Sequence, residues 1–95
     1  MLVLGAGPVG KALTKALHRH GVPVHALVDV DPRKVGGVVR GEGASWKVLP
    51  HAALAGWQPR PFAVSAVSGA PARTRVRSEL QRFGWTEGDD FVVAA

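Results

Sequence analysis

Apolar and polar positions along the chain divide it into strand-like and helix-like segments. Short, mainly apolar runs predict strands buried on both faces of a sheet; they lie at residues 2–4, 24–28, 46–49, 62–67 and 91–93. Between them, apolar residues recur at helical spacing over residues 8–20 and 72–83. Gly21 and Gly84 follow these two segments, at the position where a glycine commonly ends a helix. The chain therefore alternates strands with helices.

The connections between these segments carry turn signals of different strength. We expect a capped turn at 31–35, a short helical segment at 50–56, and turns at 68–71 and 87–90. Residues 38–45 show no clear period, and we expect a glycine-rich connection there. The alternation of elements predicts one α/β domain over residues 1–95, with right-handed crossovers between parallel strands. The expected sheet is open and has the strand order 3-2-1-4-5.

The first predicted strand leads directly into a Gly-x-Gly-x-x-Gly motif at Gly5, Gly7 and Gly10. Asp29 follows Gly10 by 19 residues, at the end of the second predicted strand. Strand, glycines, helix, strand and acid in this order are typical of a dinucleotide-binding βαβ unit. The glycines allow a tight turn, room for a pyrophosphate and close packing of helix on strand. Alternatively, they serve only that packing, in a domain without a ligand.

The expected binding residues lie where the strand order reverses. They are Gly5, Ala6, Gly7, Pro8, Val9, Gly10, Asp29 and Ser68. The Asp29 carboxylate is placed to accept hydrogen bonds from a ribose diol and to repel a 2′-phosphate, which favours NAD over NADP. Its alternative role is to cap the turn at Asp31. Arg33 and Lys34 leave the preference for NAD open, because either side chain can turn back toward a phosphate.

A dense group of arginines opens the second helix at Arg73, Arg75 and Arg77. Positive charge at a helix N-terminus opposes the helix dipole, so one explanation is an anion bound there. The other is a solvated face on which Glu79 pairs with Arg75 or Arg82.

Composition narrows the classes of function. The net charge is +5, but only the basic residues from Arg73 to Arg82 are dense, and no aromatic residues interleave with them, so we expect no nucleic-acid partner. The chain has no Cys and its four His lie scattered, which predicts neither a disulfide nor a metal site. No leader or membrane segment is evident, and we expect a cytoplasmic location. Three Trp in so small a domain favour a homodimer or a partner protein.

The series of motifs also resembles a known family. The residues that carry the resemblance are Gly5–Leu13, Val28–Gly36, Val48–Pro50 and Phe83–Phe91. The chain is similar to the small Rossmann-like domain at the C-terminus of some bacterial family 2 glycosyltransferases. It is also similar to the nucleotide-fold domain preceding sugar acyltransferases of the sialic-acid O-acetyltransferase type. The resemblance implies an accessory nucleotide-binding fold and no set of catalytic residues.

No complete catalytic constellation is visible: the chain has no Tyr for a Tyr-x-x-x-Lys pair, and no serine has a nucleophile-elbow context. We therefore expect a stand-alone module that binds an adenosine-containing nucleotide, with NAD(H) as the expected cofactor. It would act with a partner chain or as a homo-oligomer. The alternatives are a subunit of an NAD-dependent oxidoreductase and a ligand-free interaction module associated with sugar transfer.

Overall fold

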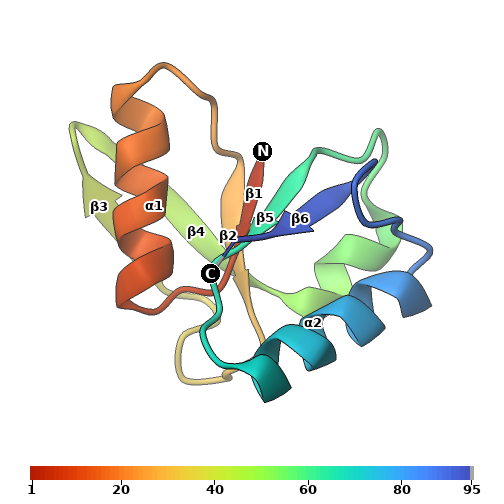
Figure 1. The fold of residues 1–95 in the computed structure, drawn as a ribbon. Helices are drawn as coiled ribbons and strands as arrows, with labels where there is room; N and C mark the ends of the chain where they lie inside the picture. The colour runs from red at the N-terminus through yellow and green to blue at the C-terminus, as the bar shows by residue number, and fades with distance from the viewer. Residues whose placement is uncertain (95) are drawn as a thin grey trace.

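The computed structural model describes residues 1–94 and shows a single sheet with helices on both faces (Figure 1). Its elements follow one another along the chain as β1 (Leu2–Leu4), α1 (Pro8–Arg19), β2 (Ala26–Asp29), β3 (Val38–Gly41), β4 (Ala44–Pro50), η1 (His51–Gly56), β5 (Ala63–Ser65), α2 (Ala70–Arg82) and β6 (Phe91–Val93). The sheet order is β3-β4-β2-β1-β5-β6. From β4 to β6 every neighbouring pair is parallel, which confirms the predicted α/β fold and the strand order 3-2-1-4-5.

Strands β2 and β5 and helix α2 differ from the predicted bounds by one or two residues at an end, and α2 begins at Ala70, inside the predicted turn at 68–71. One segment differs in kind from its prediction. Residues 38–45 do not form an irregular connection: β3 pairs with β4 in an antiparallel hairpin, with Val39 opposite Trp46 and Gly41 opposite Ala44. The hairpin turns at Glu42 (φ 55°) and Gly43 (φ 74°), and two consecutive positive φ angles suit the twist of a tight hairpin. Glu is an uncommon residue at such a φ, so the sequence gives a weak turn signal here.

Alternating residues of the central strands pack against opposite layers. Leu2 and Leu4 of β1 lie in a core cluster with Leu80 of α2. Val3 lies in the other cluster, against which Leu13 and Leu17 of α1 pack. The sheet is thus covered by α1 on one face and by α2 on the other (Figure 1), as a parallel sheet requires.

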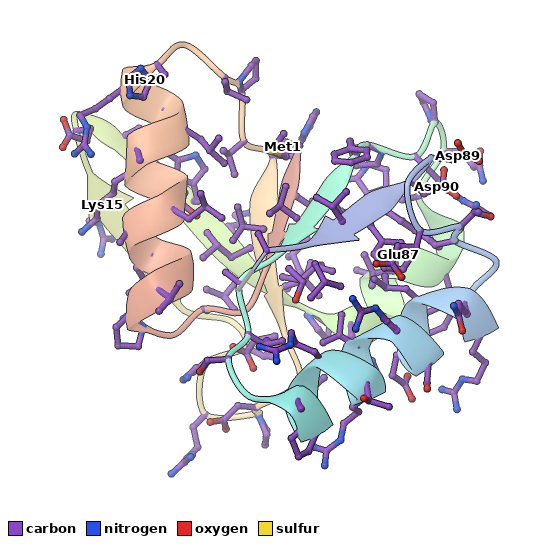
Figure 2. All side chains as sticks on the ribbon, viewed as in Figure 1. Met1, Lys15, His20, Glu87, Asp89 and Asp90 are labelled. Carbon is purple, nitrogen blue, oxygen red and sulfur yellow. The ribbon has the colours of Figure 1, made fainter. Side chains whose placement is uncertain are left out.

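The hairpin extends the layer beneath α1. The side chain of Lys15 lies across Gly41, 2.7 Å from the position that a Cβ atom there would take, and Figure 2 shows Lys15 beside β3. Arg19 of α1 forms an ion pair of 3.0 Å with Glu42 in the hairpin turn. Strand β3 therefore covers the free edge of β4, the outermost strand of the parallel sheet. Contacts with α1 hold the hairpin in place.

Candidate functional site

Two of the three motif glycines are required by the fold. Gly5 has a φ of 110°, which side chains rarely adopt. A Cβ atom on Gly10 would lie 1.8 Å from the carbonyl oxygen of Gly5, so any other residue would force α1 away from β1. The Thr14 hydroxyl donates to the Gly10 carbonyl over 2.8 Å and is fully buried. The close approach of Gly10 to Gly5 sets the first turn of α1 against the end of β1, and the Thr14 hydrogen bond lies within the helix.

Gly7 is different, because nothing in the fold requires it. Its φ is −80°, an ordinary value for any residue. The only neighbour of a Cβ atom there would be the Nζ of Lys34, at 3.7 Å, which is a normal van der Waals distance. A side chain at this position would therefore project into open space between the glycine loop and Lys34.

The same space faces the N-terminus of α1. The backbone hydrogen bonds of α1 begin at Lys11, whose N–H donates to the Gly7 carbonyl over 2.9 Å. Pro8 has no N–H, so Val9 and Gly10 supply the free donors of the first turn. These donors and the helix dipole favour an anion. The Ala6 N–H is not among them, because it already donates to Asp29 over 2.8 Å.

Asp29 lies at the end of β2 and is partly buried. Its Oδ2 accepts from the Ala6 N–H at 2.8 Å, and its Oδ1 accepts from the Asp31 N–H at 2.9 Å. The capping role considered for Asp29 is thus present, together with a link to the glycine loop. Because an ionised carboxylate has about four acceptor positions, two remain for a further donor.

Asp31 and Arg33 form hydrogen bonds and an ion pair with each other. Asp31 Oδ1 accepts from the Arg33 N–H at 2.9 Å, and the guanidinium contacts both carboxylate oxygens at 3.0 and 3.1 Å. The hydrogen bonds from the Arg33 side chain and backbone hold the pKa of Asp31 below its usual value. Asp31 therefore caps the turn, as expected. Of the two basic residues considered for a phosphate, Lys34 is the one that faces the glycine loop.

These residues surround two adjoining pockets. The first, which we call the loop pocket, is lined by Gly5, Gly7, Pro8, Val9, Asp29, Lys34, Ala66, Val67 and Ser68. The second, the apolar pocket, is lined by Leu4, Gly5, Val28, Asp29, Val30, His51, Leu54, Val67, Ala72, Arg75, Val76, Glu79 and Leu80. Gly5, Asp29 and Val67 line both. The pockets thus meet at the ends of β1, β2 and β5, where the strand order reverses.

The structure brings most of the predicted site residues together. Gly5, Gly7, Pro8, Val9, Asp29 and Ser68 all line the loop pocket. Ala6 is buried and supports the site through its N–H, and Gly10 acts through helix packing. The sequence interpretation missed the apolar pocket, including Val30, Leu54 and His51. The sequence pointed to one of these residues only in part, because Val30 directly follows Asp29. Leu54 and His51 belong to η1, which is distant in the sequence from the glycine loop.

The arginines of α2 follow the solvated interpretation for the most part. Arg82 pairs with Glu79 at 3.3 Å, as one alternative expected, and Arg77 pairs with Glu87 at 3.0 Å. Figure 2 shows Glu87 beside α2. Arg75 has no ion pair among residues 1–94 and lines the apolar pocket.

Two of the three Trp side chains are part of the core. Trp46 and Trp85 are only 6% and 2% exposed, whereas Trp57 is partly buried at the edge of a core cluster. Of the three Trp side chains, Trp57 therefore has the most surface available for contact with a partner. Three of the four His stack edge-on against aromatic rings: His18 on Trp46, His25 on Trp57 and His51 on Phe83.

Residues 1–94 contain no cluster of three or more His, Asp or Glu side chains arranged for a metal ion. Within the same range no helix is both long and apolar enough to cross a membrane. Neither observation bears on the two pockets.

Comparison with known proteins gives structural likeness only. The sequence matches no protein-family model and no curated protein. The fold is similar to a crystal structure of RSP, a Rex-family repressor, with a TM-score of 0.65 and 18% identity over 97% of this chain and 49% of that one. RSP in complex with β-NADH has a TM-score of 0.66 and 17% identity, over 97% of this chain and 50% of that one. RSP in complex with β-NAD⁺ and operator DNA has a TM-score of 0.67 and 16% identity, over 98% of this chain and 48% of that one.

The chain spans about half the length of these RSP structures. At such identities the likeness establishes the fold, which is that of a Rossmann-like domain. The operator DNA belongs to the RSP complex, and for this chain the absence of a nucleic-acid partner stays a prediction. The resemblance to domains of glycosyltransferases and sugar acyltransferases stays a prediction.

Proposed function

We propose that this chain binds an adenosine-containing dinucleotide, NAD(H) in preference to NADP(H), across the two pockets. The pyrophosphate lies in the loop pocket between Gly7 and Lys34, the adenosine ribose lies at Asp29, and the base enters the apolar pocket. This order follows the line of the pockets, because Asp29 belongs to both. The RSP complexes with β-NADH and β-NAD⁺ support the choice of cofactor.

The observation that carries the proposal is the absence of a side chain at Gly7. Gly5 and Gly10 are explained by backbone conformation and by packing, so they would be needed in an empty scaffold too. Gly7 has an ordinary φ and no close neighbour. A ligand that approaches the backbone closely gives a reason for glycine at this position.

The charges around Gly7 agree with a pyrophosphate. The Lys34 ammonium lies over the loop, and the free N–H groups of Val9 and Gly10 lie at the positive end of α1. An anion placed here would be held from two sides, by a mobile cation and by fixed backbone donors.

The remaining acceptor positions of Asp29 support the preference for NAD(H). A ribose diol supplies two hydroxyl donors to a carboxylate, whereas a 2′-phosphate would place a second negative charge against it. The Arg33 guanidinium is already paired with the Asp31 carboxylate, which reduces its capacity to offset that repulsion. We infer that the chain selects against NADP(H) at this position.

The decisive experiment compares two Gly→Ser variants by calorimetric titration with NADH, NADPH, ADP-ribose and ATP. Gly7→Ser places a side chain in the loop pocket beside Lys34, and Ser is at least as good a helix N-cap as Gly, so the fold is preserved. Gly56→Ser is the control, since a Cβ there meets nothing within 4 Å. We expect wild type and Gly56→Ser to bind NADH, and Gly7→Ser to bind it at least about tenfold more weakly, the loss of about one charge-assisted hydrogen bond.

No heat from wild type with any of the four nucleotides at millimolar concentration would overturn the proposal. The ligand-free interaction module, implied by the resemblance to sugar-transfer domains, would then take its place. If nucleotide binds, an assay for hydride transfer with candidate partner chains distinguishes a binding module from an oxidoreductase subunit. Mass spectrometry of small molecules released from the purified protein identifies what the site holds in the cell.

A further inference from the structure

The apolar pocket has one polar border. Ala72, Arg75, Val76, Glu79 and Leu80 line it from α2. Their spacing of three and four residues places them on one face of the helix. Apolar side chains from β2, η1 and α2 form most of the remaining wall. A flat apolar ligand would fit these walls, and any polar edge it carried away from Asp29 would meet Arg75, Glu79 or His51.

Asp29 and Glu79 line this pocket from different elements, Asp29 from the end of β2 and Glu79 from the face of α2. The helix α2 begins near the carboxyl end of β2 and runs away from it beneath the sheet (Figure 1). Glu79 is about two turns beyond Ala72 along that helix. A nucleoside with its ribose at Asp29 and its base in this pocket would present the base to the α2 wall that carries Glu79.

Glu79 is held in position by two cationic or potentially cationic neighbours. Its Oε2 lies 3.3 Å from Arg82 Nη2 and 3.3 Å from His51 Nδ1. The contact with His51 is at ion-pair distance but lacks hydrogen-bond geometry. Both neighbours approach Oε2, so Oε1 keeps its acceptor positions among residues 1–94. The Glu79 side chain is 28% exposed, which leaves it accessible from the pocket.

We propose that Glu79 recognises the substituent at C6 of a purine base and so selects adenine over a 6-oxopurine. The inference rests on the proposed function, because it needs the ribose at Asp29. The C6 substituent lies on the side of a purine remote from the ribose, so with the ribose at Asp29 it points away from Asp29 and toward the other polar residues of the pocket, which include Glu79. In adenine this group is an amine, which donates to the Glu79 carboxylate.

Hypoxanthine tests the same position with the opposite chemistry. It differs from adenine in carrying a C6 carbonyl, whose lone pairs would face those of the carboxylate, and a proton on N1. At the C6 position itself the carbonyl and the carboxylate are both acceptors and repel each other, and the carboxylate can accept from the N1 proton only if the base shifts out of the position that adenine takes. Shape and stacking are nearly the same for the two bases, so the comparison isolates the polar contact.

The experiment is a calorimetric titration of wild type, Glu79→Gln and Glu87→Gln with ADP and with IDP. Glu79→Gln keeps the shape of the side chain and introduces an amide that can donate to a carbonyl. Glu87→Gln is the matched control, because it also removes a carboxylate paired with an arginine of α2 but does not line the pocket. Thermal melts of the three proteins check that the fold is unchanged.

We expect wild type and Glu87→Gln to bind ADP roughly tenfold or more tightly than IDP, the size expected for one hydrogen bond to a charged group. In Glu79→Gln the preference should fall to about threefold or less. Equal binding of ADP and IDP by wild type, or an unchanged ratio in Glu79→Gln, would overturn this inference and leave nucleotide binding in place. Failure of wild type to bind ADP at all would overturn both proposals.

Discussion

The carboxylate of Asp29 accepts a hydrogen bond from the backbone N–H of Ala6, with 2.8 Å between Oδ2 and nitrogen. This bond ties the end of β2 to the glycine loop that leaves β1. Asp29 therefore has a structural task in addition to the ribose contact expected of it. A substitution at this position changes the shape of the loop as well as the chemistry offered to a ligand.

Asp29→Ala should lower both stability and affinity. The Ala6 N–H would lose its acceptor in a buried setting, which costs about 1–3 kcal/mol in the free energy of unfolding. NADH affinity should fall by on the order of tenfold or more, since a charge-assisted hydrogen bond is lost. Urea unfolding and calorimetric titration measure the two effects. Full stability in the variant would show that the bond to Ala6 does not hold the loop.

Gly10→Ala and Gly7→Val should have opposite consequences. The Ala methyl group at position 10 would meet the Gly5 carbonyl, and we expect about 1–3 kcal/mol or more of destabilisation, as for overpacked cores. The Val side chain at position 7 projects into the loop pocket, so NADH binding should be abolished while the fold is largely kept. Circular dichroism melts and titration separate the two cases. If the Gly7→Val protein folds and binds NADH as tightly as wild type, the pyrophosphate does not bind at this loop.

Lys34→Gln should weaken binding without affecting the fold. Lys34 is exposed, and substitutions at such positions change stability by about 0.5 kcal/mol or less. The loss of its charge should lower the affinity for NADH and ADP-ribose by roughly tenfold and reduce the dependence of affinity on salt. Lys47→Gln, at an exposed position of β4, is the control for a general loss of positive charge. Equal effects in both variants would mean that Lys34 acts only through net charge.

Wild type should bind NADH more tightly than NADPH. The difference arises at Asp29, where the carboxylate and a 2′-phosphate carry the same sign of charge. Competition titration of the two cofactors at one ionic strength measures it. Tighter binding of NADPH would mean that Lys34 or Arg75, and not Asp29, determines the preference between the two cofactors.

We also expect a homodimer, with Trp57 as the Trp that contributes to the interface. Trp46 and Trp85 already lie in the core, so they cannot supply the apolar surface that suggested association. Light scattering at high micromolar concentration gives the mass in solution, and Trp57→Ala should shift the equilibrium toward the monomer. A wild-type monomer at that concentration would contradict the expectation.

Local patterns in the sequence determined most of the parallel sheet and the start of the site. The apolar runs of β1 and β6 have the predicted bounds, and α1 begins at the predicted Pro8. Strand order followed because right-handed crossovers leave few arrangements for short connections. The glycine loop was visible since its spacing reflects contacts between neighbours in sequence, such as Gly5 with Gly10.

The tertiary structure alone decided which of several candidate side chains reach the two pockets. It placed Lys34 over Gly7 and left Arg33 with Asp31. It also brought Glu79 and His51, which are 28 residues apart, into contact in the wall of the apolar pocket. No local period encodes such meetings, because they depend on how α2 and η1 pack on the sheet. For the same reason, the β3–β4 hairpin became evident only from its pairing and from its covering of the sheet edge.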